Sequence, residues 1–319
     1  MPVTLVLPDL ARLANAVPRL PALETLLARA HRLPAPQYGL DGLLAACFGL
    51  PSAVLAIAAL TRLADTGARD TACWFRADPV HLAADRDQLV MLPLPTLDVQ
   101  AEEAQALAGT FNRLYADDGF RIEMRLPSRW YLRVPENMNC VTHDPARVAG
   151  GPVFDFMPSG VDAPRLKQLM NEMQMLFHEH PVNQAREAAG KPVINTAWLW
   201  GGGSLPQKTT QGSQRVLTDM PLVRGLALFT GSQAAEWPGS LEAVMAAQSG
   251  LLALQVEDVM AAAKIETQVV RPLLTGLRRG DMQTLDIYPG GPTIYRLTRA
   301  ALYRFWRRRR ALAELPGMA

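Results

Sequence analysis

Apolar residues recur along the chain at spacings that predict alternating strands and helices. Residues 3–7 form a run of leucine and β-branched side chains, which predicts a central parallel strand. In residues 21–31 the leucines recur at helical spacing and predict a helix. Residues 251–256 are again almost continuously apolar and predict another buried strand. Further on, 284–288 and 293–297 flank a Pro-Gly-Gly-Pro turn, which predicts a hairpin.

The middle of the chain carries a second set of elements. Residues 71–92 predict two strands joined by a polar turn, and 98–115 predict a helix with Asp98 as its N-cap. Residues 120–124 and 130–134 alternate apolar and polar positions, which predicts antiparallel strands around a Pro-Ser turn.

The stretch 168–203 combines several elements in a short space. Its first helix ends at Pro181, because a proline pushes the preceding residue out of the α region. Residues 183–189 predict a second, short helix. Residues 193–200 are mostly apolar, β-branched or aromatic, and predict a strand covered on both faces. Three glycines, 201–203, are expected to close that strand as a turn.

A long motif in this stretch resembles the archaeal-type, cofactor-independent (2,3-bisphosphoglycerate-independent) phosphoglycerate mutases. The motif is H-P-V-N-x-x-R-x-x-x-G-K-P, followed by an asparagine four residues after the lysine. The matching positions are His180, Pro181, Val182, Asn183, Arg186, Gly190, Lys191 and Asn195. More narrowly, the chain resembles the bacterial RpfE-type regulatory proteins.

This resemblance implies a fold and a division into domains. The fold class expected is α/β, with a mainly parallel sheet flanked by helices as in the alkaline-phosphatase-like superfamily, and with a smaller inserted α/β domain. Residues 1–71 and 201–319 would form the discontinuous main domain. Residues 72–200 would form the inserted domain, which resembles the substrate-binding domain of the mutases.

The nucleophile of the family has no counterpart in this sequence. The mutases carry Gly-Ser-Asp before a small-residue helix, and their serine accepts the phosphoryl group. The matching piece here is Gly39-Leu40-Asp41, and a leucine has no oxygen with which to attack phosphorus. The covalent step is therefore expected to be missing.

The metal ligands implied by the resemblance are also incomplete. The superfamily uses two metal ions, which need several Asp and His ligands. Asp9 is the candidate for the N-terminal metal aspartate, and Asp258 follows the strand 251–256 without the histidine expected nearby. We therefore expect no metal, no other cofactor and no catalytic residue. The sequence favours a catalytically degenerate regulatory or binding protein, and the alternative is an active phosphoglycerate mutase or another phosphoryl-transfer enzyme.

Candidate binding residues gather in the segments that match the mutases' inserted domain. Arginine suits phosphate because its planar fork donates two parallel hydrogen bonds. A phosphorylated small molecule is thus the expected ligand, with surface charges and local ion pairs as the alternative for these side chains. The candidate anion pocket consists of Arg76, Arg129, His180, Asn183, Arg186, Lys191 and Asn195. The two asparagines have a further alternative role, which is to hold loop backbone.

Composition narrows the class of protein without identifying a partner. Hydrophobic residues make up 49% and charged residues 19%, as in ordinary globular proteins, and the net charge is only +2. Three widely spaced cysteines form no CxxC pair and fit a reducing compartment. The first 30 residues lack a signal-peptide pattern, and no apolar run is long enough for a membrane span. We expect a cytoplasmic protein with a protein partner as a further candidate.

The one concentrated positive segment lies near the C-terminus. Thr298 is expected to cap a basic helix over 299–312, with Phe305 and Trp306 packed on the domain and the arginines solvated. On that interpretation nucleic acid is a disfavoured partner, although basic residues interleaved with aromatics suit it. The arginines that would contact it are Arg307, Arg308, Arg309 and Arg310.

Overall fold

The computed structural model describes residues 2–51, 55–85, 88–205, 214–237 and 250–315. The chain divides into two compact units, Met1–Val54 with Lys208–Ala319, and Leu55–Gln207. The second unit thus begins earlier than the expected inserted segment 72–200. The reason is that α3 (Ile57–Thr66) packs against the sheet of the second unit, through strands that follow it in the sequence.

The first unit is built on a mainly parallel sheet, which confirms the predicted fold class. Among the described residues, seven strands occur in the order β10-β9-β11-β1-β12-β13-β2. Central β1 (Pro2–Val6) pairs in parallel with both neighbours, so the prediction at 3–7 is confirmed within a residue. The last two strands are antiparallel to their neighbours, and the predicted hairpin is confirmed as β12 and β13. The strand bounds are β2 His31–Pro34, β9 Arg215–Thr218, β10 Gln233–Glu236, β11 Gly250–Ala253, β12 Thr284–Tyr288 and β13 Thr293–Thr298.

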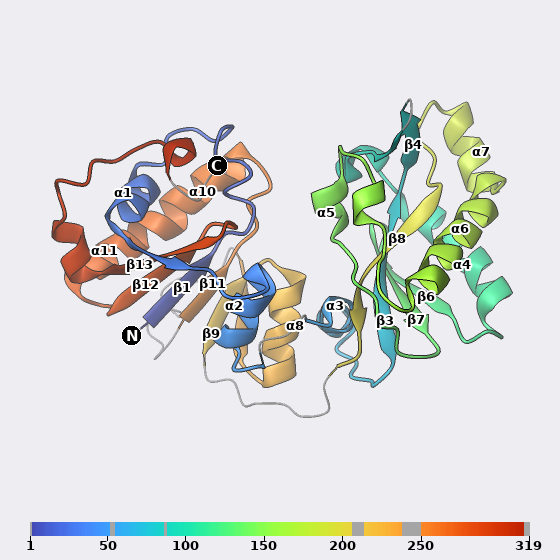
Figure 1. Cartoon of the computed structure of the whole chain (residues 1–319), viewed down its shortest axis with the longest axis horizontal. Coiled ribbons are helices and arrows are strands. Elements are labelled where there is room, and N and C mark those ends of the chain that lie inside the picture. The colour runs from blue at the N-terminus through green and yellow to red at the C-terminus, as the bar shows by residue number, and fades with distance from the viewer. Residues whose placement is uncertain (1, 52–54, 86–87, 206–213, 238–249, 316–319) are drawn as a thin grey trace. The chain divides into compact units, whose positions relative to one another are not determined.

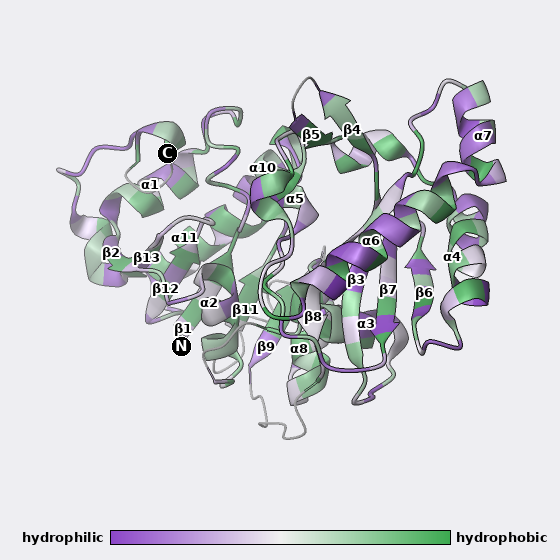
Figure 2. Cartoon of the chain, turned by 45° about the vertical axis from the view of Figure 1, so that its right-hand side comes forward, coloured by the Kyte–Doolittle hydropathy of each residue, from purple (hydrophilic) through white to green (hydrophobic). Residues whose placement is uncertain are grey.

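Helices cover both faces of this sheet (Figure 1). One face packs against α1 (Pro21–Arg29), α10 (Val259–Ile265) and α11 (Arg271–Arg279), with leucines of these helices and of the strands forming one apolar core. The other face carries α2 (Gly39–Cys47) and α8 (Pro221–Thr230). Strands β1 and β11 are apolar along their length because they are covered on both sides, as the hydropathy colours of Figure 2 show.

The second unit holds an antiparallel sheet with helices on both faces. Its order is β6-β7-β3-β8, with bounds β3 Cys73–Val80, β6 Arg121–Leu126, β7 Arg129–Val134 and β8 Thr196–Gly203. One face packs on α4 (Ala101–Tyr115) and α6 (Ala163–His178), and α3 lies on the other (Figure 1). The remaining elements are the hairpin β4 Leu82–Asp85 with β5 Gln88–Met91, the short helices α5 Pro145–Val148 and α7 Pro181–Ala188, and the 3-10 turns Leu94–Leu97 and Phe154–Phe156.

Two local predictions in this unit are wrong. The helix over 98–115 is capped by Gln100 in a reciprocal capping box with Glu103, whereas Asp98 precedes it in a left-handed conformation. The glycines expected to close a strand as a turn lie inside β8, which begins at Thr196. Two of them face the start of α3, where a Cβ at Gly201 would lie 2.9 Å from Ile57 Cβ, and a Cβ at Gly202 would lie 2.3 Å from the Phe75 ring.

The predicted basic helix over 299–312 is also wrong. Only a 3-10 turn, Arg299–Tyr303, follows β13, and a second turn covers Leu312–Glu314. A helix would have stacked arginines four positions apart with no carboxylate between them, which is repulsive. Instead, guanidinium groups donate to carbonyls at the C-terminal end of α1, where the helix dipole is negative.

No helix within the described ranges combines the length and the apolar character that crossing a bilayer requires.

Candidate functional site

The carboxyl edge of the parallel sheet is the first candidate site, because open α/β sheets bind ligands outside that edge. The segment after β1 crosses this edge under the turn of the β12–β13 hairpin. Leu7 N–H donates to Tyr288 O at 2.8 Å, and Ala11 N–H to Pro289 O at 2.8 Å. Gly290 (φ +98°) has no room for a side chain, because a Cβ would lie 1.6 Å from Pro8 O.

Leu40 lies in the first turn of α2, and its side chain contains no oxygen atom. The residue before the helix, Tyr38, has a positive φ of 69°, which is uncommon for a non-glycine residue. Leu40 is half-buried, and its hydrocarbon side chain stands at the position that the resemblance assigns to the phosphoryl-accepting serine.

Two of the carboxylates near this edge, those of Asp219 and Asp258, accept hydrogen bonds from the protein's own backbone. Asp258, which the resemblance would assign to a metal, caps α10: its Oδ1 accepts from Ala261 N at 2.7 Å. Asp219 Oδ1 accepts from Gln255 N at 2.9 Å, and burial raises the pKa of this carboxyl. Burial likewise raises the pKa of Asp9, which Arg12 partly offsets.

These side chains do not fit a two-metal centre. Within the described ranges, no three His, Cys, Asp or Glu side chains come together as a metal would need. The carboxylate of Asp258 already accepts a backbone hydrogen bond as a helix cap.

The second candidate site is the face of the antiparallel sheet that carries α3. Strand β3 alternates strictly here, with Phe75 in the core and Trp74, Arg76 and Asp78 on the α3 side. Arg76 Nη2 donates to Asp78 Oδ1 at 2.6 Å, and its guanidinium carbon lies 5.2 Å from the ring centroid of Trp200. Trp200 Nε1 in turn donates to Asp78 Oδ2 at 2.7 Å. Arg76 is therefore held beside an aromatic ring by a buried carboxylate.

Arg129 occupies the same face in a separate ion pair. Its Nη2 donates to Asp65 Oδ1 at 2.9 Å, and Tyr131 Oη donates to Asp65 Oδ2 at 2.6 Å. Burial raises the pKa of Tyr131, so its hydroxyl stays protonated and donates a hydrogen bond to Asp65. Arg76 and Arg129 thus share one face of one sheet, as the prediction of a common pocket requires, and both are paired with carboxylates.

Sequence reasoning missed the partners of these arginines. Arg62 of α3 adds a third guanidinium, which lies 4.0 Å above the Trp74 ring and pairs with Asp70 at 2.8 Å and Glu123 at 2.9 Å. The W-x-R-x-D alternation of β3 is the one local signal that could have indicated this face. The whole group consists of Arg62, Arg76 and Arg129 with Asp65, Asp70, Asp78 and Glu123.

The motif that carries the resemblance lies on other elements and holds loops in place. His180 is the N-cap of α7, where its Nδ1 accepts from Val182 N at 3.2 Å. Asn183 is fully buried and bonds to Phe177 O and to both backbone groups of Ile194. Its amide group therefore connects the end of α6 to the residues just before β8 through hydrogen bonds.

Asn195 and Arg186 act in the same way over longer distances. The Asn195 side chain accepts from Leu82 N at 2.9 Å and donates to Leu82 O at 2.7 Å. It thereby joins the residue before β8 to the first residue of β4. Arg186 is 2% exposed; its Nε donates to Pro192 O at 2.7 Å, its Nη1 to Glu103 Oε2 at 2.6 Å, and its Nη2 to Leu97 O.

Lys191 is the exposed member of the motif. Its Nζ lies 3.7 Å from Asp98 Oδ2, a distance at which two solvated side chains attract weakly. Anion binding by the seven predicted residues remains a prediction. For His180, Asn183, Arg186 and Asn195 the structure records intramolecular hydrogen bonds, and for Arg76, Arg129 and Lys191 an acidic neighbour.

Comparison with characterised proteins places the chain beside the phosphoglycerate mutases. No protein-family model matches it. A probable 2,3-bisphosphoglycerate-independent phosphoglycerate mutase of Geobacter sulfurreducens is 25% identical over 266 residues, covering 73% of this chain and 66% of that protein. The enzyme of Methanothrix thermoacetophila is 26% identical over 229 residues, covering 61% and 57%. The matched regions thus span less than two thirds of these relatives.

One solved structure shares the fold. A Pyrococcus horikoshii protein superimposes with a TM-score of 0.53 at 13% identity, covering 92% of this chain and 86% of that one. A cofactor-independent phosphoglycerate mutase from Thermoplasma acidophilum gives a TM-score of 0.46 at 17% identity, covering 99% and 94%.

Proposed function

We propose that this homologue of the cofactor-independent phosphoglycerate mutases acts by binding, as a regulatory or scaffold protein, and does not carry out covalent phosphoryl transfer. The observation that carries the proposal is Leu40 in the first turn of α2. A phosphoenzyme requires an oxygen, nitrogen or sulfur nucleophile at that place, and leucine offers only carbon.

The carboxyl edge of the sheet supports the same conclusion. Two-metal phosphoryl transfer needs ligands that hold both ions while the attacking and leaving oxygens align. Asp258 is instead engaged as a helix cap, and Asp219 accepts a backbone N–H. A regulatory role also agrees with the resemblance to RpfE-type proteins.

The ligand we propose is a phosphorylated small molecule held at the α3 face of the second unit. Arg76 and Arg129 lie on neighbouring strands there, and each guanidinium is paired with one carboxylate. A phosphate would have to exchange with Asp78 or Asp65, so we expect modest affinity and selectivity for ligands of at least two negative charges.

Intact-mass measurement and thermal unfolding test this proposal together. The purified chain and Leu40→Ser are incubated with 3-phosphoglycerate and manganese, and each is weighed for a phosphoryl adduct. We expect no adduct on either protein, since the serine alone restores no metal ligand. A phosphorylated chain would contradict the proposal.

The binding half is measured by the shift in melting temperature with phosphorylated ligands, using inorganic sulfate as the control anion. A ligand that binds only the folded state raises the melting temperature by mass action. Arg76→Lys keeps the charge but removes the fork, and we expect it to reduce the shift. Equal shifts for both proteins would place the ligand elsewhere.

A further inference from the structure

The arginine-rich segment 299–310 stands apart from the rest of the chain in charge. It contains six arginines and no acidic residue, whereas the whole chain carries a net charge of +2. The remainder therefore carries 2 − 6 = −4. This segment concentrates positive charge on an otherwise mildly acidic protein, so it attracts polyanions locally.

Both ends of the segment are anchored, which presents its middle to solvent. Leu302 and Leu312 are buried in the core of the first unit. Between them the backbone is not helical, and it is tied to the end of α1 by two guanidinium groups. Arg304 Nη1 donates to Arg29 O at 3.2 Å, and Arg307 Nη1 donates to Ala30 O at 2.9 Å.

Three aromatic side chains stand exposed on this anchored loop, and for Phe305 and Trp306 this contradicts the prediction that they pack on the domain. Tyr303 is 68% exposed, Phe305 79% and Trp306 66%. The last two contact each other edge to face, with ring centroids 5.4 Å apart, so each leaves a ring face open. Exposed rings held by an anchored backbone cost little further entropy when a flat partner stacks on them.

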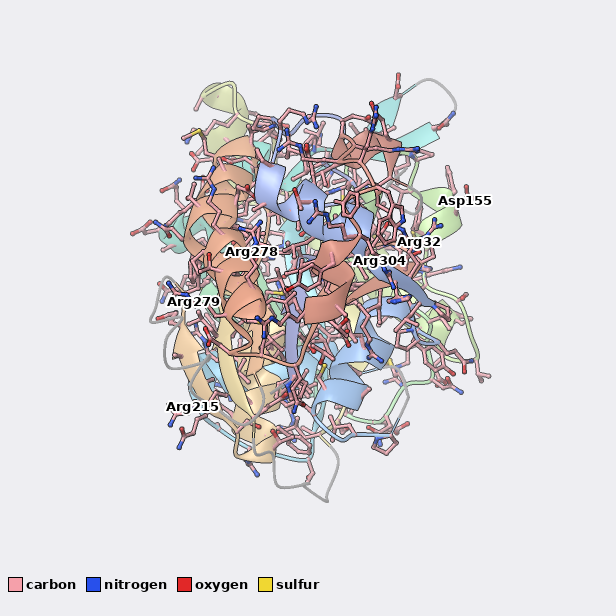
Figure 3. All side chains as sticks on the ribbon, turned by 90° about the vertical axis from the view of Figure 1, so that its left-hand side faces the viewer. Arg32, Asp155, Arg215, Arg278, Arg279 and Arg304 are labelled. Carbon is pink, nitrogen blue, oxygen red and sulfur yellow. The ribbon has the colours of Figure 1, made fainter. Side chains whose placement is uncertain are left out.

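Arginines adjoin the aromatic residues along the chain. Arg308 and Arg310 are exposed and form no ion pair or hydrogen bond with the described residues, and Arg309 lies 3.5 Å from Glu24. His31 of the neighbouring edge strand β2 contacts the Arg304 side chain, and Arg32 follows it in that strand (Figure 3 labels Arg32 and Arg304). The loop therefore carries cations both before and after the aromatic pair in sequence.

We propose that segment 299–310 binds single-stranded nucleic acid, an interaction independent of the phosphoglycerate-mutase-like site. Phosphates pair with the arginine forks, and unpaired bases stack on Phe305 and Trp306. In a duplex the bases are stacked on one another, so their faces are not accessible for stacking on the rings. An acidic peptide offers carboxylates without flat bases, and the loop lacks the amphipathic helix typical of binding to a membrane surface.

The test is fluorescence anisotropy with labelled oligo-uridine and oligo-thymidine, a matched duplex, and poly-glutamate as competitor. The electrostatic variant is Arg308→Ser with Arg310→Ser, which spares the arginines that hold the loop. Its control is Arg121→Ser with Arg133→Ser, an exposed cross-strand pair of the second unit with the same charge change. Melting temperatures verify that the variants remain folded.

We expect single strands to bind in preference to the duplex, with affinity falling as salt rises. Removing two phosphate contacts lowers the log–log salt slope by about 1.4, which is about 25-fold weaker binding at about 0.1 M salt. The control pair should bind as the unaltered chain does.

The stacking variant is Phe305→Ala with Trp306→Ala, compared with Phe305→Tyr and Trp306→Phe, which keep flat rings. We expect the alanine variant to bind at least about fivefold more weakly and the ring-preserving variant to bind normally. Equal binding of duplex and single strand, no effect of the alanine variant, or full displacement by poly-glutamate at equal charge would overturn the proposal. So would binding to anionic lipid vesicles without binding to single strands.

Discussion

Replacing Arg186 with alanine distinguishes a structural role of the H-P-V-N motif from an anion-binding role. The guanidinium is 2% exposed and donates to Pro192 O, Leu97 O and Glu103 Oε2. The substitution leaves two carbonyls without this donor, and the largely buried Glu103 carboxylate loses its cation and keeps the hydrogen bond from Gln100 N–H. Each buried group that loses its partner costs about 1–3 kcal/mol, and breaking a buried ion pair costs about 3–5 kcal/mol in total.

We therefore expect Arg186→Ala to lower the free energy of unfolding of the second unit by about 3–5 kcal/mol. Lys191→Ala is the matched control from the same motif, because Lys191 is 45% exposed and lies 3.7 Å from Asp98. We expect its effect to stay within about 0.5 kcal/mol.

The assay is urea unfolding followed by tryptophan fluorescence. Four of the six tryptophans, Trp74, Trp130, Trp198 and Trp200, lie in the second unit and are buried. Adding Glu103→Gln to the arginine variant removes the stranded charge and should recover part of the loss. The structural account of this motif is refuted if Arg186→Ala unfolds at the same urea concentration as the unaltered chain yet no longer binds phosphorylated ligands.

Three further predictions follow from single contacts. Burial, and secondarily Arg113, lowers the pKa of His180 below its usual 6.5. As the pH falls, the imidazole therefore binds a proton in the unfolded chain at a higher pH than it does in the folded chain. The contribution of His180 to stability is thus fully present above pH 6.5 and is lost below it. In urea unfolding measured at a series of pH values, His180→Asn, which keeps an N-cap that does not titrate, should reduce this loss. An unchanged pH profile would show that other groups cause it. Gly290→Ala should lower the melting temperature far more than Gly231→Ala, since a Cβ meets Pro8 O at 1.6 Å in the first case and nothing within 4 Å in the second; equal shifts would show that the turn relaxes freely. Asp258→Ala should cost about 1 kcal/mol through the lost cap and leave the metal content measured by mass spectrometry unchanged, whereas a loss of bound metal would identify it as a ligand.

The sequence predicted those parts of the fold that depend on local periodicity. The central strand at 3–7 and the hairpin around Gly290 depend on apolar runs and turn residues a few positions apart, and both are confirmed. The prediction of a helix over 299–312 is wrong because Leu302 and Leu312 are buried in the core of the first unit and two arginines bond to the end of α1, which is a distant element that no local pattern reveals.

The candidate site was harder to predict because its partners are remote in sequence. Arg186 bonds to Glu103, 83 residues away, and Asn195 bonds to Leu82, 113 residues away. The same residue types that bind phosphate also satisfy buried carbonyls, so the motif alone could not separate the two roles. The prediction about Leu40 does not depend on contacts with distant residues, because a leucine side chain lacks the reactive atom in any surroundings.

The most direct test of the central claim is phosphorus NMR of 3-phosphoglycerate incubated with the purified chain and manganese. The assay needs no coupling enzyme and detects any conversion to 2-phosphoglycerate. A chain with Leu40 in the nucleophile position should leave the substrate spectrum unchanged over many hours. Conversion at a rate proportional to the protein concentration, and abolished by a chelator, would contradict the account.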